Sequence, residues 1–489
     1  MKWIIVAALA ATPALAEPAF EDRSFRLVPH SYTGDWVHFV GGGVAILDCN
    51  GDGLPDLFAA GGHNPARLMI NEGTFSFSDG GAFATGVTGA YPLDIDADGH
   101  MDLAVLRDGA NQLLKGDGAC GFTDASADWG FEGGDKWTTA FTAGWPDGDL
   151  LMVFGNYVDR TNPEGPFGTC DTHALHRLSQ GRLWKTSLGP GFCTLSMLLS
   201  DWQRSGTPLL RVSNDRHYHQ DKGYEQMFDL ATLAPVADWP EVRLWGMGIA
   251  SDDVTGDGLP DVMLSSMGDQ LLQLNDGGAF KDAPYAMGTF ATTPHVGEDN
   301  RPSTGWHTEF ADVDNDGRLD LFIAKGNVEA MPEAAARDPN NLLLQNADGT
   351  FSEVSAKAGV ASMSRSRGAG LADFDLDGRL DLVVVNRGAP MEIYRNVTAD
   401  AGNWLAVEVR QVGPNRNAVG AWIEVRHANG MLAREVTVGG GHASGQAGPT
   451  HFGLAGSETA RVRVIWSDGQ AGAWQEVAAN TRLLLERDR

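Results

Sequence analysis

DVDNDGRLD, at residues 312–320, is the stretch that decides the fold, because close variants of this nine-residue pattern occur five times along the chain. The pattern is DxDxDGxxD, with Asn or Thr at the third position in two of the copies. A short apolar run typical of a buried strand follows each copy. The copies begin at Asp48, Asp94, Asp253, Asp312 and Asp373. Their regular return predicts a repeated β unit.

The spacing of oxygen-bearing residues in each copy predicts a calcium loop. Side-chain oxygens at positions 1, 3, 5 and 9 and the backbone carbonyl at position 7 can converge on one hard cation, and glycine at position 6 permits the turn. We therefore expect about five Ca²⁺ ions as cofactors. The candidate ligands, with position 7 contributing its carbonyl, are Asp48, Asn50, Asp52, Leu54, Asp56; Asp94, Asp96, Asp98, His100, Asp102; Asp253, Thr255, Asp257, Leu259, Asp261; Asp312, Asp314, Asp316, Arg318, Asp320; and Asp373, Asp375, Asp377, Arg379, Asp381.

Two other interpretations of the loops are possible. An EF-hand needs a glutamate at position 12 and flanking helices, whereas position 12 is here Ala59, Val105, Leu264, Ile323 or Val384. The EF-hand is therefore excluded. A metal-free Asp/Gly turn between strands explains any single copy, but five copies in register favour calcium.

Two degenerate copies complete the count of repeats. Residues 143–151 (AGWPDGDLL, with Asp147) and 201–209 (DWQRSGTPL) each lack at least two ligands, so we expect no calcium there. The units then begin at residues 48, 94, 143, 201, 253, 312 and 373, which gives a period of 46 to 61 residues. We predict an all-β fold: a seven-bladed β-propeller with calcium loops plus a small C-terminal β domain. Residues near Phe25 to Pro29 are expected to pair with the last blade.

The N-terminal residues predict export. Residues 1–16 combine a lysine, an apolar stretch and the ending Ala14-Leu15-Ala16, which is typical of a cleaved signal peptide. No later run approaches the roughly 20 apolar residues of a membrane span, so we expect no transmembrane segment. The mature protein is expected to be periplasmic or secreted.

Four cysteines in an exported chain predict two disulfides, although three pairings are possible. Cys170 and Cys193 flank one irregular insertion, and Cys49 and Cys120 sit in neighbouring units, so these two pairs are favoured. Free buried cysteines are the alternative.

The charge of the chain limits its partners. The formal net charge is -28, and the five loops hold 18 of the 64 acidic residues. Bound calcium would offset part of this charge, and the remaining acidity argues against nucleic acid and anionic membranes as partners. Cationic groups, neutral glycans and proteins remain possible partners.

After about residue 400 the acidic repeat stops and alternating strand patterns follow. The segments NRNAVGAWIEV (415–425), HFGLAG (451–456), VIWSDG (464–469) and AANTRLLL (478–485) resemble an ASPIC/UnbV domain. The acidic repeats resemble the VCBS and FG-GAP repeats of propellers such as that of integrin α chains. Together they resemble a bacterial member of the cartilage acidic protein family. The implied domains are a signal peptide at 1–16, an FG-GAP/VCBS-type propeller at 17–400 and an ASPIC/UnbV-like domain at 401–489.

Candidate residues for chemistry outside the loops are few. His217 and His219, two residues apart, could bind a transition metal or act with Asp215 as an acid/base site, unless they are solvated in a polar loop. Bulky residues shortly before the loops could ring the mouth of the propeller channel and hold a sugar or peptide, unless they are core residues. These are Trp36, His38, Trp137, Trp245, Trp306 and His307.

Two functions remain open at this point. The resemblance implies an extracytoplasmic recognition or adhesion module for a glycan or protein partner, with no reaction. The alternative is a carbohydrate-active, lyase-like enzyme built on the propeller, which would need a histidine or other base facing the channel. We expect binding rather than catalysis, because no nucleophile elbow, phosphate loop, zinc protease or dinucleotide motif is present.

Overall fold

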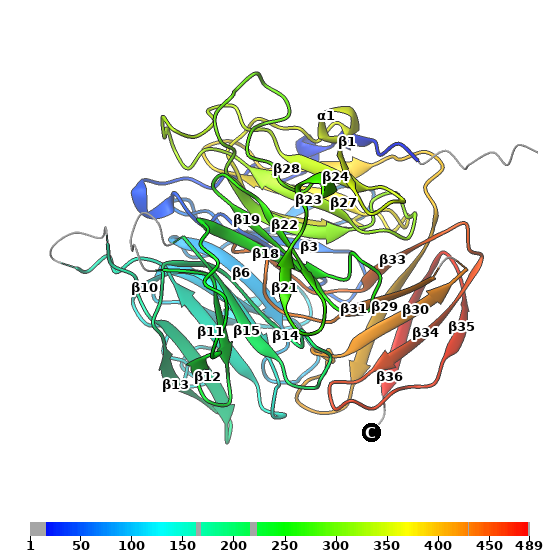
Figure 1. Cartoon of the computed structure of the whole chain (residues 1–489). Helices are drawn as coiled ribbons and strands as arrows, with labels where there is room; N and C mark the ends of the chain where they lie inside the picture. The colour runs from blue at the N-terminus through cyan, green and yellow to red at the C-terminus, as the bar shows by residue number, and fades with distance from the viewer. Residues whose placement is uncertain (1–15, 163–167, 216–222, 429, 488–489) are drawn as a thin grey trace, which may run out of the picture.

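The computed structural model describes residues 16–162, 168–215, 223–428 and 430–487. The predicted signal peptide, apart from Ala16, and His217 and His219 lie outside the described residues. The described chain is almost entirely β (Figure 1). Its only helical pieces are three 3-10 turns and a single α-helical turn, and none of these could cross a membrane. They are η1 (Ser24–Arg26), η2 (Trp36–His38), η3 (Tyr285–Met287) and α1 (Ser355–Ala358).

Up to residue 396, the described strands fall into seven antiparallel units of four strands each, and the second and third units join into one eight-stranded sheet where Lys136 and Trp137 pair with Gly109 and Asp108. Units 1 and 2 are β2 (Val44–Leu47), β3 (Asp56–Ala59), β4 (Arg67–Asn71), β5 (Phe77–Ala82) and β6 (Val87–Leu93), β7 (Asp102–Gly109), β8 (Gln112–Gly116), β9 (Phe122–Asp124). Units 3 and 4 are β10 (Lys136–Gly144), β11 (Leu151–Asn156), β12 (His173–Ser179), β13 (Arg182–Leu188) and β14 (Thr194–Ser200), β15 (Leu209–Asn214), β16 (Gln226–Asp229), β17 (Ala234–Pro235). Units 5 and 6 are β18 (Gly246–Asp252), β19 (Asp261–Ser266), β20 (Leu271–Asn275), β21 (Phe280–Asp282) and β22 (Gly305–Ala311), β23 (Asp320–Lys325), β24 (Asn341–Gln345), β25 (Phe351–Glu353). This is the expected propeller architecture.

Unit 7 combines the two ends of the propeller sequence. Strands β26 (Ser366–Ala372), β27 (Asp381–Asn386) and β28 (Glu392–Asn396) are completed by β1 (Phe20–Asp22), with Phe20 opposite Asn396. An N-terminal strand therefore covers the edge of the last unit, but it lies earlier than the expected Phe25 to Pro29. The reason is local: the Asp22 carboxylate accepts the Ser24 N–H at 2.8 Å, and the chain then turns into η1.

The core lies between neighbouring units. The inner strands β6 and β14 and the second strands β11 and β19 are buried along their whole length, because other units cover both of their faces. One apolar cluster, for example, joins units 1, 2 and 7, and in it Phe75 and Phe77 of unit 1 pack edge-on against Phe374 of unit 7. Apolar strands thus serve first as packing between the units.

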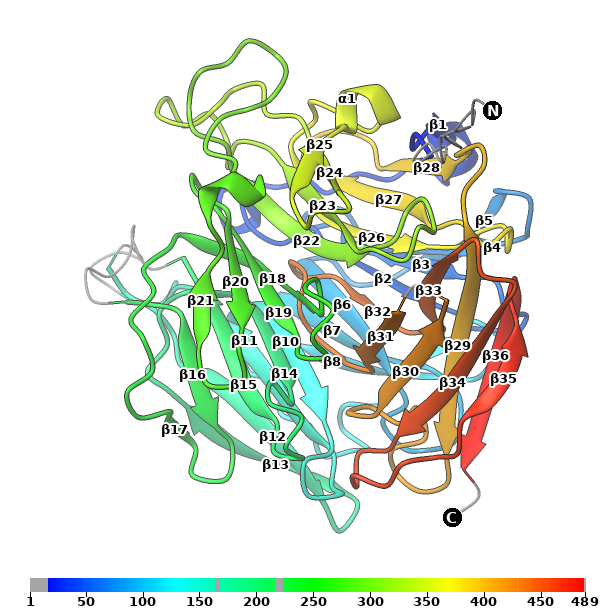
Figure 2. The same ribbon diagram turned by 45° about the vertical axis from the view of Figure 1, so that its right-hand side comes forward.

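The C-terminal residues form a second β domain with its own core. One of its sheets has the order β33-β29-β36 and the other β31-β30-β34-β35. Figure 2 shows this domain, in orange to red, beside the propeller. Its strands are β29 (Asn403–Gln411), β30 (Trp422–His427), β31 (Gly430–Glu435), β32 (Gly445–Gln446), β33 (Thr450–Ala455), β34 (Thr459–Ile465), β35 (Gln475–Ala478) and β36 (Thr481–Arg487).

A stretch of the C-terminal domain, residues 438–446, runs among the inner strands of the propeller, and we call it the axial segment. Its short strand β32 pairs in parallel with β2 of unit 1 (Figure 2). Moving along the segment, Val438 O accepts the N–H of Ala143 in unit 3, Gly440 N–H donates to Met197 O in unit 4, and Gly441 N–H donates to Ile249 O in unit 5.

The rest of the axial segment reaches the remaining units. His442 N–H donates to Nδ1 of His307 in unit 6 at 3.2 Å. Ser444 forms a bridge with Ala90 in unit 2 and packs against Gly368 in unit 7. All seven inner strands therefore contact this one segment, which occupies the middle of the propeller.

Glycines in the inner strands make room for the axial segment. A Cβ atom on Gly43 would lie 1.8 Å from the Ala443 carbonyl oxygen, and one on Gly89 would lie 2.1 Å from the same atom. Both distances are far inside van der Waals contact, so only glycine allows the two backbones to approach.

The two favoured disulfides are both present. Cys49 is joined to Cys120 and thereby links units 1 and 2, and Cys170 is joined to Cys193 and links unit 3 to the start of unit 4. No cysteine of the chain is free.

We predict that Gly89→Ala destabilises the whole protein. The added methyl group would overlap the Ala443 backbone, and relieving such overpacking costs about 1–3 kcal/mol. The free energy of unfolding should fall by this amount in urea titrations. The matched control is Gly456→Ala, where a Cβ atom meets nothing within 4 Å, and an equal loss in the two variants would contradict the close approach.

Candidate functional site

The five acidic loops share one backbone conformation. Position 6 is a glycine with positive φ in every loop, and position 4 also has positive φ although only two of its residues are glycine. An asparagine, an alanine and a leucine therefore accept a left-handed conformation that costs free energy. The position 4 residues and their φ values are Gly51 (77°), Ala97 (61°), Gly256 (75°), Asn315 (59°) and Leu376 (59°).

Hydrogen bonds to the acidic side chains hold this conformation. The carboxylate at position 1 accepts the N–H of the position 6 glycine at 2.8 to 3.0 Å in all five loops. The carboxylate at position 9 accepts the N–H of position 2 and, with its other oxygen, an N–H on the third strand of the same unit. For Asp56 these donors are Cys49 at 2.9 Å and Asn71 at 2.8 Å. Positions 1 and 9 therefore build the loop before any metal is considered, a role that the sequence motif did not reveal.

The carboxylate at position 5 has a similar role, because it accepts the N–H of position 7. The side chains at position 7 differ between loops. Arg318 and Arg379 each pair with the position 5 carboxylate of their own loop, Asp316 and Asp377. His100 is exposed, while Leu54 and Leu259 are half-buried.

Position 3 distinguishes the loops as candidate cation sites. Three loops with aspartate at this position each bring three carboxylates within 4.8 Å of one another. These groups are Asp94, Asp96, Asp102; Asp312, Asp314, Asp316; and Asp373, Asp375, Asp381. The loops at Asp48 and Asp253 carry Asn50 and Thr255 at position 3 instead.

Buried oxygens without partners show that the donor set fits a hard cation. Asp94 Oδ1 and Asp375 Oδ1 are buried and accept no hydrogen bond in the described structure. A buried carboxylate oxygen in this state is costly unless a cation approaches it. Carboxylate oxygens at this spacing are the ligands that calcium prefers.

Burial and mutual repulsion raise the pKa of the loop carboxyls. Burial is the largest cause throughout, and the charges of neighbouring aspartates add to it. It raises the pKa of Asp102 and Asp316 to about 7 and that of Asp373 to about 6. Asp312 and Asp320, both fully buried, have pKa values well above the ordinary range for the same two reasons.

Two loops also have a basic side chain supplied by the third strand of their unit. Lys115 on β8 pairs with Asp96 and Asp98, and Arg395 on β28 pairs with Asp375 at 2.6 Å. Lys115 and Arg395 each precede the third-strand residue whose N–H binds the position 9 carboxylate. In the unit that contains the Asp312 loop, the residue at this place on β24 is Leu344, which carries no charge. Within the described part of the chain, Arg318 is the one basic side chain that forms an ion pair with any of the four carboxylates of that loop.

The C-terminal domain covers the face of the propeller that carries the acidic loops. At the loop that begins at Asp312, His451 Nε2 of this domain lies 2.7 Å from Asn315 Oδ1. Gly402 N–H donates to Asp314 O at 2.9 Å. A Cβ atom on Gly453 would lie 1.9 Å from Asp312 Oδ2, so the two chains pass in direct contact.

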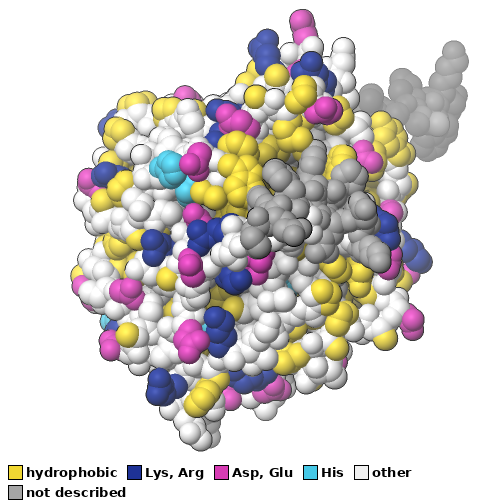
Figure 3. Space-filling model, turned by 90° about the vertical axis from the view of Figure 1, so that its left-hand side faces the viewer, with side chains coloured by type: hydrophobic (Ala, Val, Ile, Leu, Met, Phe, Trp, Pro, Cys, Tyr) yellow, Lys and Arg dark blue, Asp and Glu magenta, His cyan; other side chains and the backbone are white. Residues whose placement is uncertain are grey.

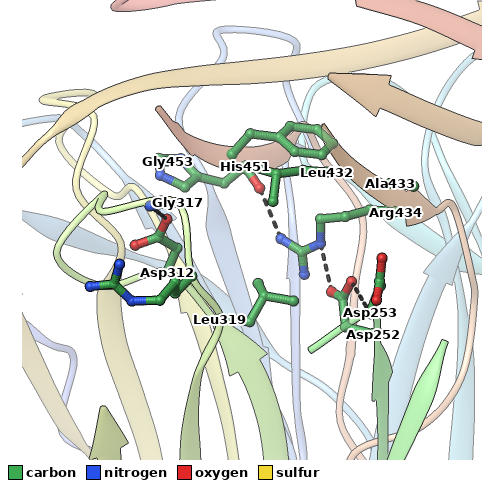
Figure 4. A pocket seen from close by; sticks show the side chains of 12 residues that line it. Asp252, Asp253, Asp312, Gly317, Leu319, Leu432, Ala433, Arg434, His451 and Gly453 are labelled. Carbon is green, nitrogen blue, oxygen red and sulfur yellow. Dashed lines mark hydrogen bonds and ion pairs between the residues drawn. The ribbon is translucent and has the colours of Figure 1, made fainter. Parts of the chain in front are cut away.

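A small pocket between the domains lies beside the same loop (Figure 4). Arg434 of β31 points into it, pairs with Asp252 at 2.7 Å and donates to His451 O at 2.9 Å. Asp253 and Asp312, the first residues of two acidic loops, line the pocket from the propeller side. Nothing in the sequence pattern linked Arg434 or His451 to these loops.

The two degenerate loops differ from each other. Asp147 is exposed and pairs with Arg177 at 3.1 Å, so it closes no loop. Asp201 keeps the structural role of position 1, because it accepts the Gly206 N–H at 2.6 Å. The C-terminal domain contacts it as well, through Glu435, which accepts the Asp201 N–H.

The aromatic residues expected at the channel mouth surround the axial segment. Trp306 is fully buried, donates its Nε1–H to Gly326 O and lies beneath the Arg367 guanidinium. His307 is buried and accepts the His442 N–H, while Trp245 is partly buried in the same apolar cluster as Trp306. These residues therefore belong to the core, which is the alternative to an open ring at the channel mouth, and the centre of the propeller is filled.

One cluster of potential metal ligands was not assembled from the sequence. Asp35, His38 and His63 bring one ligand atom each within 4.8 Å of one another. His38 is 2% exposed, and burial lowers its pKa to about 4. Its spacing from His63 follows no local motif, so only the tertiary structure brings them together.

Comparison with known families identifies both parts of the chain. Residues 411–489 match ASPIC and UnbV, and residues 48–105, 253–323 and 333–421 match the FG-GAP-like repeat. The chain is 26% identical to cartilage acidic protein 1 of Mus musculus over 257 residues, which are 51% of this chain and 38% of that protein. The match to the Homo sapiens protein is 26% over 257 residues, 51% of this chain and 37% of that one. Thus the chain carries FG-GAP-like repeats followed by an ASPIC and UnbV domain.

Solved structures resemble the chain more distantly. BBS1N, crystallised in complex with ARL6DN, has a TM-score of 0.47 at 9% identity, covering 77% of this chain and 97% of that one. The Dos1 propeller has a TM-score of 0.36 at 12% identity, covering 76% of this chain and 96% of that one.

We predict that chelated protein loses stability as the pH rises from 5 to 7.5. Carboxyls whose folded pKa is raised stabilise the fold fully below their unfolded pKa, near 3.9, and this contribution is lost as the pH rises through their folded pKa. Asp102 and Asp316, with pKa values of about 7, lie in this window. Thermal unfolding in a chelator should therefore show a falling melting temperature.

Asp316→Asn should flatten this pH dependence, whereas Asp276→Asn should not. Asp276 is exposed and its pKa is lowered, first by the hydrogen bond from Lys281, so it is already ionised across the window. Identical pH slopes in Asp316→Asn and the parent would contradict the interpretation.

Proposed function

We propose that this protein is an exported calcium-binding propeller that acts as a recognition or adhesion module for an extracytoplasmic glycan or protein. The observation that carries the proposal is the set of five loops with one backbone conformation, in which buried aspartates converge beneath the C-terminal domain. The carboxylates within each loop repel one another unless a cation neutralises them.

Calcium in these loops would be structural. The loops at Asp94, Asp312 and Asp373 hold four carboxylates each and should bind most tightly, whereas Asn50 and Thr255 supply neutral ligands to the other two. Because four loops also touch the C-terminal domain, a bound ion would fix the surface on which that domain sits. Such contacts include Gly53 O with Arg482 and Asp94 with Arg416.

Two disulfides support an extracytoplasmic location, because disulfides persist in oxidising compartments. The similarity to cartilage acidic protein 1 supports the same location, although the aligned part is less than two fifths of that protein.

The partner surface is best sought away from the C-terminal domain. The centre of the propeller is filled by the axial segment, so a partner would bind exposed loops. Trp184 of unit 3 is 63% exposed and Tyr285 after unit 5 is 77% exposed, and aromatic residues of this kind stack on sugars or anchor proteins. Acidic and basic side chains are interspersed over the face shown in Figure 3, which does not favour a highly charged polymer.

We predict that the calcium stoichiometry depends on individual loops. Asp314→Ala should lower the number of bound calcium ions by one and lower the melting temperature in calcium. An ion at a hundredfold excess over its Kd stabilises the fold by about 2.7 kcal/mol per site. Calorimetric titration and thermal unfolding with and without a chelator measure both effects.

The matched control is Asp147→Ala in a degenerate loop, which should leave the stoichiometry unchanged. Equal calcium counts in Asp314→Ala and the parent, or a melting temperature indifferent to the chelator, would contradict calcium binding by the loops.

We predict that a glycan or matrix-protein array will show calcium-dependent binding that Trp184→Ala weakens. Phe25→Ala is the control, because Phe25 is 71% exposed but adjoins unit 7. An activity screen on uronic polysaccharides accompanies the array. Turnover that His217→Ala abolishes would replace the binding function by an enzymatic one.

A further inference from the structure

A second kind of metal-ligand cluster lies at the other end of unit 1 from its acidic loop. Strand β3 begins at Asp56 of the acidic loop, and His63 follows the end of the same strand. Asp35 and His38 come from the turn η2, which lies against this end of the strand. The Thr33 N–H donates to Gly61 O at 3.1 Å, and the His63 N–H donates to Thr33 O at 2.9 Å. The backbone therefore holds the two segments together without any metal.

The three side chains face one another. Asp35 Oδ1 lies 3.6 Å from His63 Nε2 and 4.0 Å from His38 Nδ1. The two imidazole rings have centroids 4.9 Å apart in an edge-on arrangement. Two nitrogens and one carboxylate oxygen thus lie within 4.8 Å of one another.

His38 supplies an independent sign that a ligand is missing. Its ring is almost completely buried, yet neither Nδ1 nor Nε2 has a hydrogen-bond partner in the described structure. Burying a polar ring in this state costs free energy unless a partner binds it. The ring also packs closely against Gly34, where a Cβ atom would lie 2.6 Å from Nδ1.

We propose that Asp35, His38 and His63 bind a zinc ion or a similar first-row dication, at a site distinct from the acidic loops. Imidazole nitrogens favour such ions over calcium, which prefers an all-oxygen set. Ligands 2.0 to 2.1 Å from a tetrahedral zinc lie about 3.4 Å apart, close to the separations here.

Small movements of the exposed ligands would complete the site. The side chains of Asp35 and His63 are 72% and 56% exposed, so they can rotate inward toward the buried His38. Solvent also reaches the cluster from this side, so an ion can enter and water can fill the fourth position.

The surrounding charges permit a dication. Arg387 is the nearest base: its Nε donates to His38 O at 3.0 Å and its Nη2 donates to Gly34 O at 2.8 Å. Its charge is offset by Glu329, with which it forms an ion pair. Arg387 therefore holds the backbone of the ligand turn, and among the described residues Asp35 forms ion pairs with the two histidines and with no lysine or arginine.

The test is a calorimetric titration of the full chain with Zn²⁺ in the presence of saturating Ca²⁺, which measures the number of zinc ions bound and their affinity. A visible spectrum with Co²⁺ reports the nitrogen ligands directly. We expect one zinc site per chain, and the affinity should fall at least about tenfold in His63→Ala and in Asp35→Asn. Both residues are exposed, so neither change should disturb folding.

Two control variants identify the site. His295→Ala removes an exposed histidine outside the cluster and should bind zinc as the parent does. The double variant of His217 and His219 to alanine should also keep the site. The proposal is overturned if the parent binds no zinc under these conditions, if His63→Ala binds as tightly as the parent, or if the double variant loses the ion.

Discussion

The two hydrogen bonds accepted by each ninth-position aspartate are the constraint on which five of the seven propeller units depend. One oxygen of the carboxylate holds the loop between the first and second strands, and the other holds the third strand, as Asp56 does with Cys49 and Asn71. The carboxylate that accepts these two hydrogen bonds is buried beside the other aspartates of its loop, so these carboxylates repel one another. A cation in the loop would remove that repulsion, which explains why the same aspartates serve both structure and the proposed metal binding.

The repeat, the β architecture, the C-terminal domain and both disulfide pairs could be predicted from the sequence, because each leaves a local signature. The strand that completes unit 7 lies at Phe20–Asp22 and not near Phe25 to Pro29. The Ser24 N–H donates to the Asp22 carboxylate and ends β1, and strand propensity does not encode this contact. The candidate loops were located correctly by spacing, although whether they bind calcium remains a prediction.

Contacts between distant segments could not be predicted. His442 reaches His307, Arg434 reaches Asp252, and His38 meets His63 only because the tertiary structure superposes them. The spacing of the bulky residues before the loops did not indicate that a segment of another domain would lie among them. Their contacts with the axial segment could therefore not be predicted.

The axial segment also imposes an order on assembly. The piece that fills the centre of the propeller belongs to the last hundred residues of the chain, and the strand that completes unit 7 lies near its beginning. The propeller therefore cannot complete its interior until residues 438–446 are available. Its centre stays unfilled for as long as the C-terminal part of the chain is still being synthesised.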